Sequence, residues 1–560
     1  MLSNYTLRYL KISVNNLVLW NMHSRTLLKL TLYLAVFRMK KTFILYQIPL
    51  LFLSVYLSVG GCSKKTALRA EKPIESPKRE FRAAWVATVD NIDWPSNKNL
   101  TTNAQKIEFI RILDRHQELG INAAMVQVRA AADAFYARGT EPWSEWLTGV
   151  QGESPDSYYD PMAFMIEESH RRNIEFHAWL NLSRGTHKAS KSIADNHITK
   201  THPEWFFTYD KHMLFNLGIP EVREYIVDIV RNIAKFYNVD GIHFDDYFYP
   251  YTVVGQRIDD DAAFRKYGQG FTNVDDWRRY NVDETIKGIA AAIKGEKPRV
   301  KFGISPFSVW RNASVDPLGS QTQGGQTSYD NLYADTRKWF REGLIDYIAP
   351  QIYFTIEFDK VPYQTMTDWW VKQSDQRHIY IGHGTYRVGN TDRDKAWALP
   401  NQIPRQVRYN RSKKGVNGSI FYNTTSLFRN SLGVADSLKR LNQRVALTPT
   451  MPWKDNVPPN APQNVTAKRA SDIGIVVTWK TPKVSARDDE PIHKWVIYRF
   501  ETGELMNLED TKNIVAIMPN TGLVNYLDNT TRKDRSYVYL VTALDRLQNE
   551  SAPSNQVQVK

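Results

Sequence analysis

Residues 239–250, VDGIHFDDYFYP, contain a short apolar run that ends in two adjacent carboxylates. Because side chains alternate between the two faces of a strand, Ile242 and Phe244 would share one face while His243 and Asp245 share the other. The segment before this run has apolar residues at helical spacing, namely Val222, Ile226, Ile229, Ile233 and Phe236. A helix followed by a buried strand with acids at its end is one unit of an α/β fold.

The same alternation of apolar run and amphipathic helix repeats across residues 79–445. The β-rich runs lie at 83–89, 123–128, 174–180, 241–245, 300–305, 347–352, 378–382 and 418–421. Eight strand–helix units over this length predict a (β/α)8 TIM barrel. A doubly wound open sheet is the alternative, but no G-x-G-x-x-G motif follows the first run.

The C-terminal part has a different pattern. Residues 446–460 are rich in proline and lack periodicity, which is typical of a linker. Residues 461–560 contain short strands at the spacing of a β-sandwich, among them VVTW and WVIYRF. This part resembles a fibronectin type III module, and the resemblance implies a spacer or an ancillary binding module.

The N-terminal residues indicate export. Residues 39–61 have a short basic start, an apolar run and two glycines before Cys62, as in a secretory signal peptide. This arrangement resembles a bacterial lipoprotein signal, which implies that Cys62 is lipidated. Residues 1–38 are interpreted as an upstream extension, and residues 62–78 as a flexible tether. The prediction is a lipid-anchored envelope protein, in the outer or cytoplasmic membrane; a transmembrane anchor is the alternative.

Charge and cysteine content exclude several classes. The chain has 560 residues and a formal net charge of +14, and residues 1–62 hold seven Lys or Arg and no acid, which leaves +7. A mildly basic surface suits an anionic envelope polymer or membrane, but no dense basic stripe indicates nucleic-acid binding. A single cysteine allows neither a disulfide framework nor a cysteine-based zinc site.

Barrel enzymes place their active sites at the carboxyl ends of the strands. Alternation along each run predicts which side chains point toward the barrel axis there. The predicted substrate-binding residues are Arg129, Asn181, Arg184, His243, Ser305, Gln351, Tyr353, Trp143 and Tyr247. Buried polar side chains lower stability unless they form hydrogen bonds, so a ring of them suggests a binding site. The structural alternative is that these side chains hydrogen-bond only one another and close the barrel.

Two carboxyl groups are the usual requirement for glycoside hydrolysis. Asp245 and Asp246 are the first candidates, because close like charges raise one pKa, as an acid catalyst requires. Glu141, beside Trp143 and Trp146, is the candidate from another loop. If the substrate carries an N-acetyl group next to the bond, that group can be the nucleophile and one acid with one orienting carboxylate suffices. The weaker acidic candidates are Glu145, Glu204, Asp90 and Glu357.

The barrel region resembles the glycoside hydrolase family 10-like domain of bacterial lipoproteins. The motifs that carry the resemblance are 79–96 (REFRAAWVATVDNIDWPS), 122–149, HAWLNLSR (177–184), HPEWF (202–206), 239–250 and DYIAPQIYF (346–354). The resemblance implies glycan hydrolysis by a TIM barrel. It also implies, for one branch, cleavage of peptidoglycan strands stripped of stem peptides.

Rival functions stay open at this point. A glycan-binding lipoprotein without catalysis, or an adhesion protein built on the sandwich, would share the architecture. A metal-dependent polysaccharide deacetylase would use a related barrel, with His177, His243 and His383 near its axis. Their spacing forms no zinc helix motif, so the sequence predicts neither metal nor cofactor.

Overall fold

The computed structural model describes residues 76–560, except residue 375 and residues 485–489. The predicted upstream extension, signal peptide, Cys62 lipidation site and most of the tether therefore lie outside the described residues. In the described part, no helix is both long enough and apolar enough to cross a membrane.

Eight parallel strands close into a barrel, which confirms the predicted fold class. Their order around the barrel is β1-β11-β10-β9-β8-β7-β3-β2. The strands are β1 (Phe81–Val86), β2 (Ala123–Arg129), β3 (Glu175–Leu180), β7 (Gly241–Phe244), β8 (Lys301–Ile304), β9 (Tyr347–Ile348), β10 (His378–His383) and β11 (Val416–Phe421). All eight predicted runs contain a strand, although β9 is only two residues long because Pro350 offers no N–H for the ladder.

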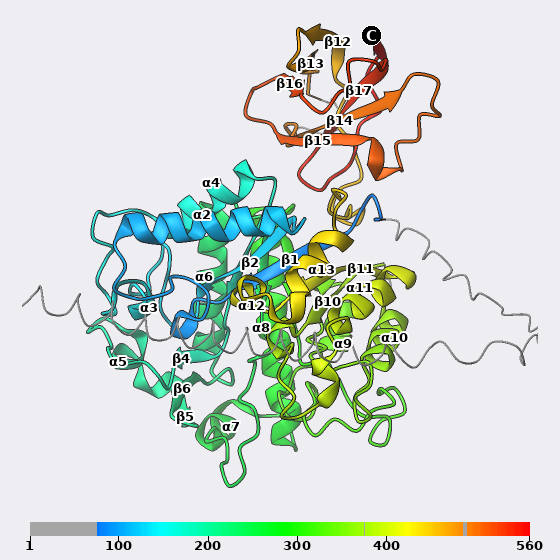
Figure 1. The fold of residues 1–560 in the computed structure, drawn as a ribbon. Coiled ribbons are helices and arrows are strands. Elements are labelled where there is room, and N and C mark those ends of the chain that lie inside the picture. The colour runs from blue at the N-terminus through cyan, green and yellow to red at the C-terminus, as the bar shows by residue number, and fades with distance from the viewer. Residues whose placement is uncertain (1–75, 375, 485–489) are drawn as a thin grey trace, which may run out of the picture. The chain divides into compact units, whose positions relative to one another are not determined.

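One helix follows each strand and lies on the outside of the barrel (Figure 1). These helices are α2 (Thr102–Glu118), α4 (Pro161–Arg171), α6 (Pro220–Phe236), α8 (Val274–Glu296), α9 (Thr336–Arg341), α10 (Tyr363–Gln373), α11 (Gln402–Ser412) and α13 (Val434–Leu441). Helix α6 buries Val222, Ile226, Ile229 and Ile233 against the strands, as its spacing predicts. Phe236 at its end is 46% exposed, because the helix stops there.

The amino ends of the strands are closed by the segment that the sequence indicates as a linker. Met451 is fully buried in the lower barrel core. Thr448 donates to Glu175 at 2.6 Å, and Glu175 also accepts from the buried Lys301 at 2.6 Å. Trp453 and Lys454 both donate to Asp346 at 2.8 Å. The first half of this segment is therefore part of the barrel rather than a free connection.

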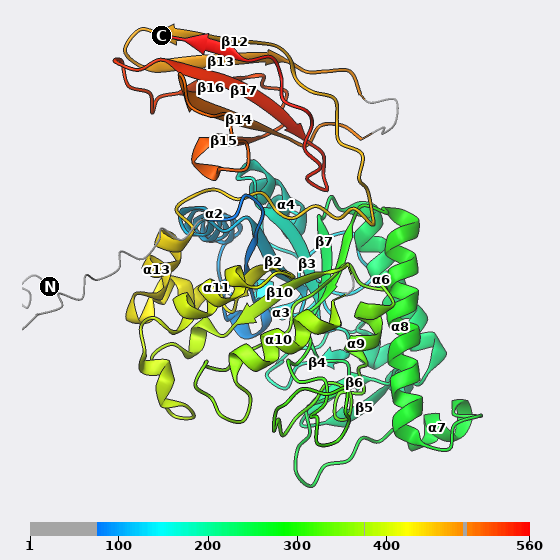
Figure 2. The same cartoon turned by 90° about the vertical axis from the view of Figure 1, so that its right-hand side faces the viewer.

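The loops at the carboxyl ends of the strands carry the insertions. After β3, the short strands β4 (Arg184–Thr186), β5 (Phe206–Tyr209) and β6 (His212–Phe215) form a separate sheet in the order β4-β6-β5. Shorter inserted helices are α3 (Glu145–Thr148), α5 (Ile198–Thr201), α7 (Asp261–Tyr267) and α12 (Thr424–Arg429). Figure 2 shows β4–β6 and α7 together at one end of the barrel.

Residues 463–559 form an antiparallel sandwich of two sheets. One sheet has the order β12-β13-β16 and the other β15-β14-β17-β18, which is the fibronectin type III topology. The strands are β12 (Gln463–Ala470), β13 (Gly474–Lys480), β14 (Lys494–Glu501), β15 (Ile514–Pro519), β16 (Asn525–Asp528), β17 (Tyr537–Leu544) and β18 (Val557–Val559). Trp479 and Trp495 pack in its core at 5.6 Å between ring centroids.

Candidate active site

Asp245 follows the last residue of β7 and lies among hydrogen-bond donors. Trp179 at the end of β3 donates its indole N–H to Oδ2 at 3.0 Å, and the Asn181 amide lies 3.1–3.2 Å from both carboxylate oxygens. The backbone N–H of Tyr247 donates to Oδ1 at 3.2 Å. Both oxygens are thus occupied. Burial raises the pKa of Asp245 above its usual value, and the Arg184 guanidinium and these hydrogen bonds oppose that rise. We interpret Asp245 as a carboxylate held in its anionic form.

Asp246 has a different environment. Asp246 is 97% buried, and its carboxyl contacts the Tyr251 hydroxyl, with a further hydrogen bond to Gln351. Burial, and then the negative charge of Asp245, raise the pKa of Asp246 to about 7. Adjacent residues in one loop therefore divide into an anion and a group that holds its proton near neutral pH, the division that sugar hydrolysis requires.

This raised pKa predicts how stability depends on pH. The unfolded chain loses the Asp246 proton near pH 4 while the folded chain keeps it to about pH 7, so the residue lowers stability progressively between these values. Asp246→Asn is expected to raise the free energy of unfolding above pH 7 by on the order of 4 kcal/mol, with no gain at pH 4. Urea unfolding of both proteins at pH 4 and pH 8 checks this; an equal difference at the two pH values would contradict it.

A layer of polar side chains lies beneath the two aspartates. His243 is fully buried, with its Nε2 3.0 Å from the Ser305 hydroxyl and its Nδ1 3.1 Å from the Tyr347 hydroxyl. The Gln351 amide donates to the Ser305 carbonyl oxygen at 2.8 Å. Burial holds the pKa of His243 well below its usual range, so the imidazole is neutral. Strand alternation placed these residues on the inner face, and the structure brings them together there.

Tyrosines form one wall of the site. Tyr353, Tyr386 and Tyr422 come from three different strand ends, with ring centroids 5.6–5.9 Å apart. Tyr386 is 38% exposed, so part of this wall faces solvent. Such faces are suitable for packing against a sugar ring.

A cavity of about 190 Å³ lies between strands β4 and β6 and the loop after β7; neither aspartate lines it, but Tyr247 and Tyr251 of that loop do. Its lining includes Arg184, His187, Lys188, His212 and Tyr251. The guanidinium of Arg184 lies 4.0 Å from the centroid of the Tyr247 ring. Arg184 is 92% buried, yet it forms no ion pair within the described residues. Burial and the neighbouring Arg184 lower the pKa of His187 to about 3 and that of His212 to about 4, so neither ring is charged at neutral pH.

Glu141 and Arg129 pair with each other, and Arg129 Nη1 also donates to the backbone carbonyl oxygen of Asn181 at 2.6 Å. Arg129 Nε and Nη2 each lie 2.7 Å from a Glu141 oxygen, and Tyr225 of α6 donates to Glu141 at 3.1 Å. Within the described residues, Glu141 hydrogen-bonds neither aspartate. A register shift occurs between Gln127 and Arg129 in the β2–β3 pairing, at the end of β2. The pair ties the loop after β2 to helix α6.

We therefore expect Glu141 to act in stability rather than catalysis. Glu141→Ala leaves the buried Arg129 charge without its partner and is expected to lower the free energy of unfolding by about 3–5 kcal/mol. In Glu141→Gln, the turnover of the folded protein is expected to stay within about tenfold of wild type, because no proton transfer is lost. Denaturant unfolding and glycan hydrolysis measure both effects; a loss of 100-fold or more in folded Glu141→Gln would restore Glu141 as a catalytic residue.

The remaining acidic and aromatic candidates have partners of their own. Trp143 packs edge-on against Tyr158 at 6.3 Å. Glu145 accepts from the backbone N–H of Lys191 at 3.0 Å, and Glu357 pairs with Arg405. Glu204 pairs with His202 at the surface, and Asp90 is exposed. None of these acids hydrogen-bonds Asp245 or Asp246 in the described part of the chain.

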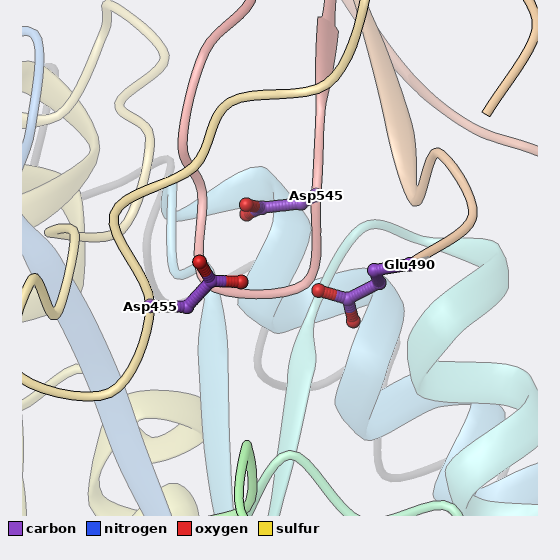
Figure 3. A group of neighbouring side chains, drawn as sticks. All are labelled: Asp455, Glu490 and Asp545. Atoms are coloured by element: carbon purple, nitrogen blue, oxygen red, sulfur yellow. The ribbon is translucent and has the colours of Figure 1, made fainter. Parts of the chain in front are cut away.

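A second acidic group lies apart from these strand ends. Asp455, Glu490 and Asp545 bring their carboxylates within 4.8 Å of one another (Figure 3). Arg299 Nε lies 3.3 Å from Asp455 and 3.0 Å from Glu490. The guanidinium supplies positive charge to this group, which we interpret as an ion-pair network.

Two contacts of the aspartates could not be predicted from the sequence pattern. Alternation along residues 174–180 turns Trp179 toward the barrel axis, but it does not reveal the indole bond to Asp245. Tyr251 was missed, although it follows the 239–250 motif directly in a tyrosine-rich loop. Its position one residue beyond that motif was the available signal.

A closed (β/α)8 barrel with paired acids at its strand ends, followed by a fibronectin type III sandwich, has the architecture of a modular glycosyl hydrolase. Residues 80–399 match the family described as Glycosyl hydrolase-like 10. The chain belongs to this family, and it is a glycosyl hydrolase by homology.

Curated relatives agree with this assignment. The chain is 44% identical to glycosyl hydrolase YngK of Bacillus subtilis over 484 residues, which cover 85% of this chain and 93% of that protein. It is 37% identical to glycosyl hydrolase DigH of Escherichia coli K12 over 371 residues, 62% of this chain and 84% of DigH. Among solved structures, the glycoside hydrolase domain of PgaB (BpsB) from Bordetella bronchiseptica is 13% identical with a TM-score of 0.41, covering 64% of this chain and 99% of that domain.

Proposed function

We propose that the protein hydrolyses O-glycosidic bonds of peptidoglycan glycan strands, with Asp246 as the general acid. The observation that carries this proposal is the unequal environment of the two adjacent aspartates. Asp246 keeps a proton to about pH 7, whereas Trp179, Asn181 and the Tyr247 backbone hold Asp245 as an anion. In the reaction, the Asp246 proton passes to the glycosidic oxygen as the bond from that oxygen to the anomeric carbon breaks.

Asp245 is proposed to orient the substrate rather than attack it. Both of its oxygens already accept hydrogen bonds, which reduces their availability as nucleophiles. The second carboxyl expected from another loop, Glu141, is engaged by Arg129 and Tyr225. These contacts favour the variant in which an N-acetyl oxygen of the substrate attacks the anomeric carbon and Asp245 stabilises the positive charge that develops on that group. Water then adds to the anomeric carbon and gives a proton to the Asp246 carboxylate, as the bond from the N-acetyl oxygen to that carbon breaks.

The cavity lined by Arg184, Tyr247 and Tyr251 supports a substrate that carries N-acetyl and acidic groups. Arg184 lines it without an ion pair in the described residues, so a substrate carboxylate would find a partially desolvated cation there. Peptidoglycan strands without stem peptides carry both N-acetyl groups and free carboxylates. The proposed location is the cell envelope, through a lipid on Cys62, which follows from the signal-like residues 39–61.

The test uses protein that begins after Cys62. It is incubated with purified glycan strands lacking stem peptides, with intact peptidoglycan, and with a neutral polysaccharide as control. We expect release of reducing ends from the stripped strands, and no release by Asp246→Asn. Equal release from the neutral polysaccharide would contradict the proposed substrate, and release by Asp246→Asn at the wild-type rate would contradict the proposed acid.

A further inference from the structure

Tyr251 lies between the cavity and Asp246. It lines the cavity together with Arg184 and Tyr247, and its hydroxyl contacts the Asp246 carboxyl. Asn181 and Trp179, by contrast, bond Asp245. Tyr251 therefore separates the cavity from Asp246, the acid of the proposed reaction.

The loop that carries Tyr251 is fixed in place. The backbone N–H of Val253 donates to the Tyr209 hydroxyl on β5 at 2.8 Å, which ties the loop to the small sheet. The Tyr251 ring packs edge-on against Tyr247 at 5.3 Å and Phe307 at 6.1 Å. A side chain held from both sides can fix the orientation of the carboxyl that it contacts.

The groups around Asp246 determine whether its pKa rises or falls when a neighbour is changed. Asp245 opposes its ionisation, whereas hydrogen bonds from Tyr251 and Gln351 favour it. The other titratable groups nearby are Tyr247 and Tyr353 in the same rim and Arg184, which acts on Asp245 and Tyr247. Among these groups, the Tyr251 hydroxyl contacts the Asp246 carboxyl directly and can donate to it once the proton has left.

We propose that Tyr251 is a positioning residue, which orients Asp246 toward the leaving oxygen and stabilises its ionised form by donating a hydrogen bond. The inference rests on the proposed role of Asp246 as the acid. When Asp246 gives up its proton, the Tyr251 O–H points at the new carboxylate and spreads its charge. Without the hydroxyl, Asp246 is a weaker acid with a less defined orientation.

The test compares Tyr251→Phe with Tyr249→Phe. Tyr249 lies in the same loop, and its buried hydroxyl has no hydrogen-bond partner among the described residues, so its removal is a matched control. In Tyr251→Phe we expect the upper pH limit of kcat/KM to rise by about one to two units, because a hydrogen bond to the ionised carboxyl is lost. We also expect kcat to fall about tenfold or more at pH 6, with wild-type behaviour in Tyr249→Phe.

Two further measurements separate the possible failures. Adding Tyr251→Phe to Asp246→Asn is expected to change kcat no further, and a ring-fluorinated tyrosine at position 251, a stronger donor, should lower the pH limit. An unmoved pH limit in both position-251 variants, with Asp246→Asn inactive, overturns this inference but leaves the proposed acid intact. Wild-type turnover in Asp246→Asn overturns the proposed acid itself.

Discussion

Asp246→Asn is expected to lower kcat on glycan strands by about 10²–10⁴-fold, with a much smaller change in KM. The amide has nearly the shape of the carboxyl and can keep the contacts to Tyr251 and Gln351, but it has no proton to give at neutral pH. In the wild-type enzyme, kcat/KM should fall as the pH rises through about 7, where Asp246 of the free enzyme loses its proton. The measurement is the release of reducing ends at limiting and at saturating substrate between pH 5 and pH 9.

Asp259→Asn is the matched control for this variant. Asp259 lies in the loop that follows the acidic pair, and it is exposed. The same change of charge there should leave kcat within about twofold of wild type, because exposed groups outside the site contribute little. If kcat fell as far in Asp259→Asn as in Asp246→Asn, both effects would come from a change in the loop rather than from the loss of proton transfer.

Asp245→Asn is expected to lower kcat by about 10²–10³-fold, the usual effect of removing one preorganised electrostatic group from a transition state. The substitution also turns an acceptor of four hydrogen bonds into a group that must donate, which opposes the Trp179 and Asn181 donors. Kinetics on strands with and without N-acetyl groups check the role of Asp245. The enzyme should cleave only the acetylated strands.

Added azide distinguishes a nucleophilic role of Asp245 from an orienting role. If Asp245 were the nucleophile, azide added to Asp245→Ala would replace it and release a glycosyl azide of inverted configuration. The orienting role predicts no such product, since the N-acetyl oxygen still occupies the anomeric face. Detection of the inverted glycosyl azide would contradict the orienting role while leaving Asp246 as the acid.

The sequence was sufficient for the barrel because each unit repeats a strong local pattern. Buried strands and amphipathic helices alternate eight times, and the last helix before the acidic pair, α6, buries the apolar positions that its spacing indicates. Exceptions occur where a helix meets solvent. Ile107 fits the periodicity of α2 but is 58% exposed, because the buried face of that helix is built on Phe109, Ile112 and Leu113.

The site was predictable only as far as strand alternation holds. Residues predicted from that rule do meet in the structure: His243 hydrogen-bonds Ser305, and Asn181 donates to Asp245. Arg129 follows a register shift in the β2–β3 pairing, which apolar periodicity does not reveal, and its contacts to Glu141 and to the Asn181 carbonyl oxygen were not foreseen. Tertiary contacts of loops carry no periodic signal, which is why Tyr251 at Asp246 was not foreseen.

The packing of residues 446–455 against the barrel was also not predicted, because it too depends on tertiary contacts. Proline content and the absence of periodicity indicated a free linker, but they do not show what a segment packs against. Met451 fills the lower barrel core, and Thr448 and Trp453 provide donors for acids at the amino ends of the strands. Local composition therefore does not reveal that this segment closes the barrel.

The division of the two aspartates into acid and anion is the central claim, and neutron diffraction of the deuterated enzyme at pH 6 tests it most directly. We expect a deuteron on the Asp246 carboxyl and none on Asp245, with the Trp179 indole and Asn181 amide deuterons directed at Asp245. A bare Asp246 carboxylate, or a deuteron on Asp245 instead, would contradict the claim.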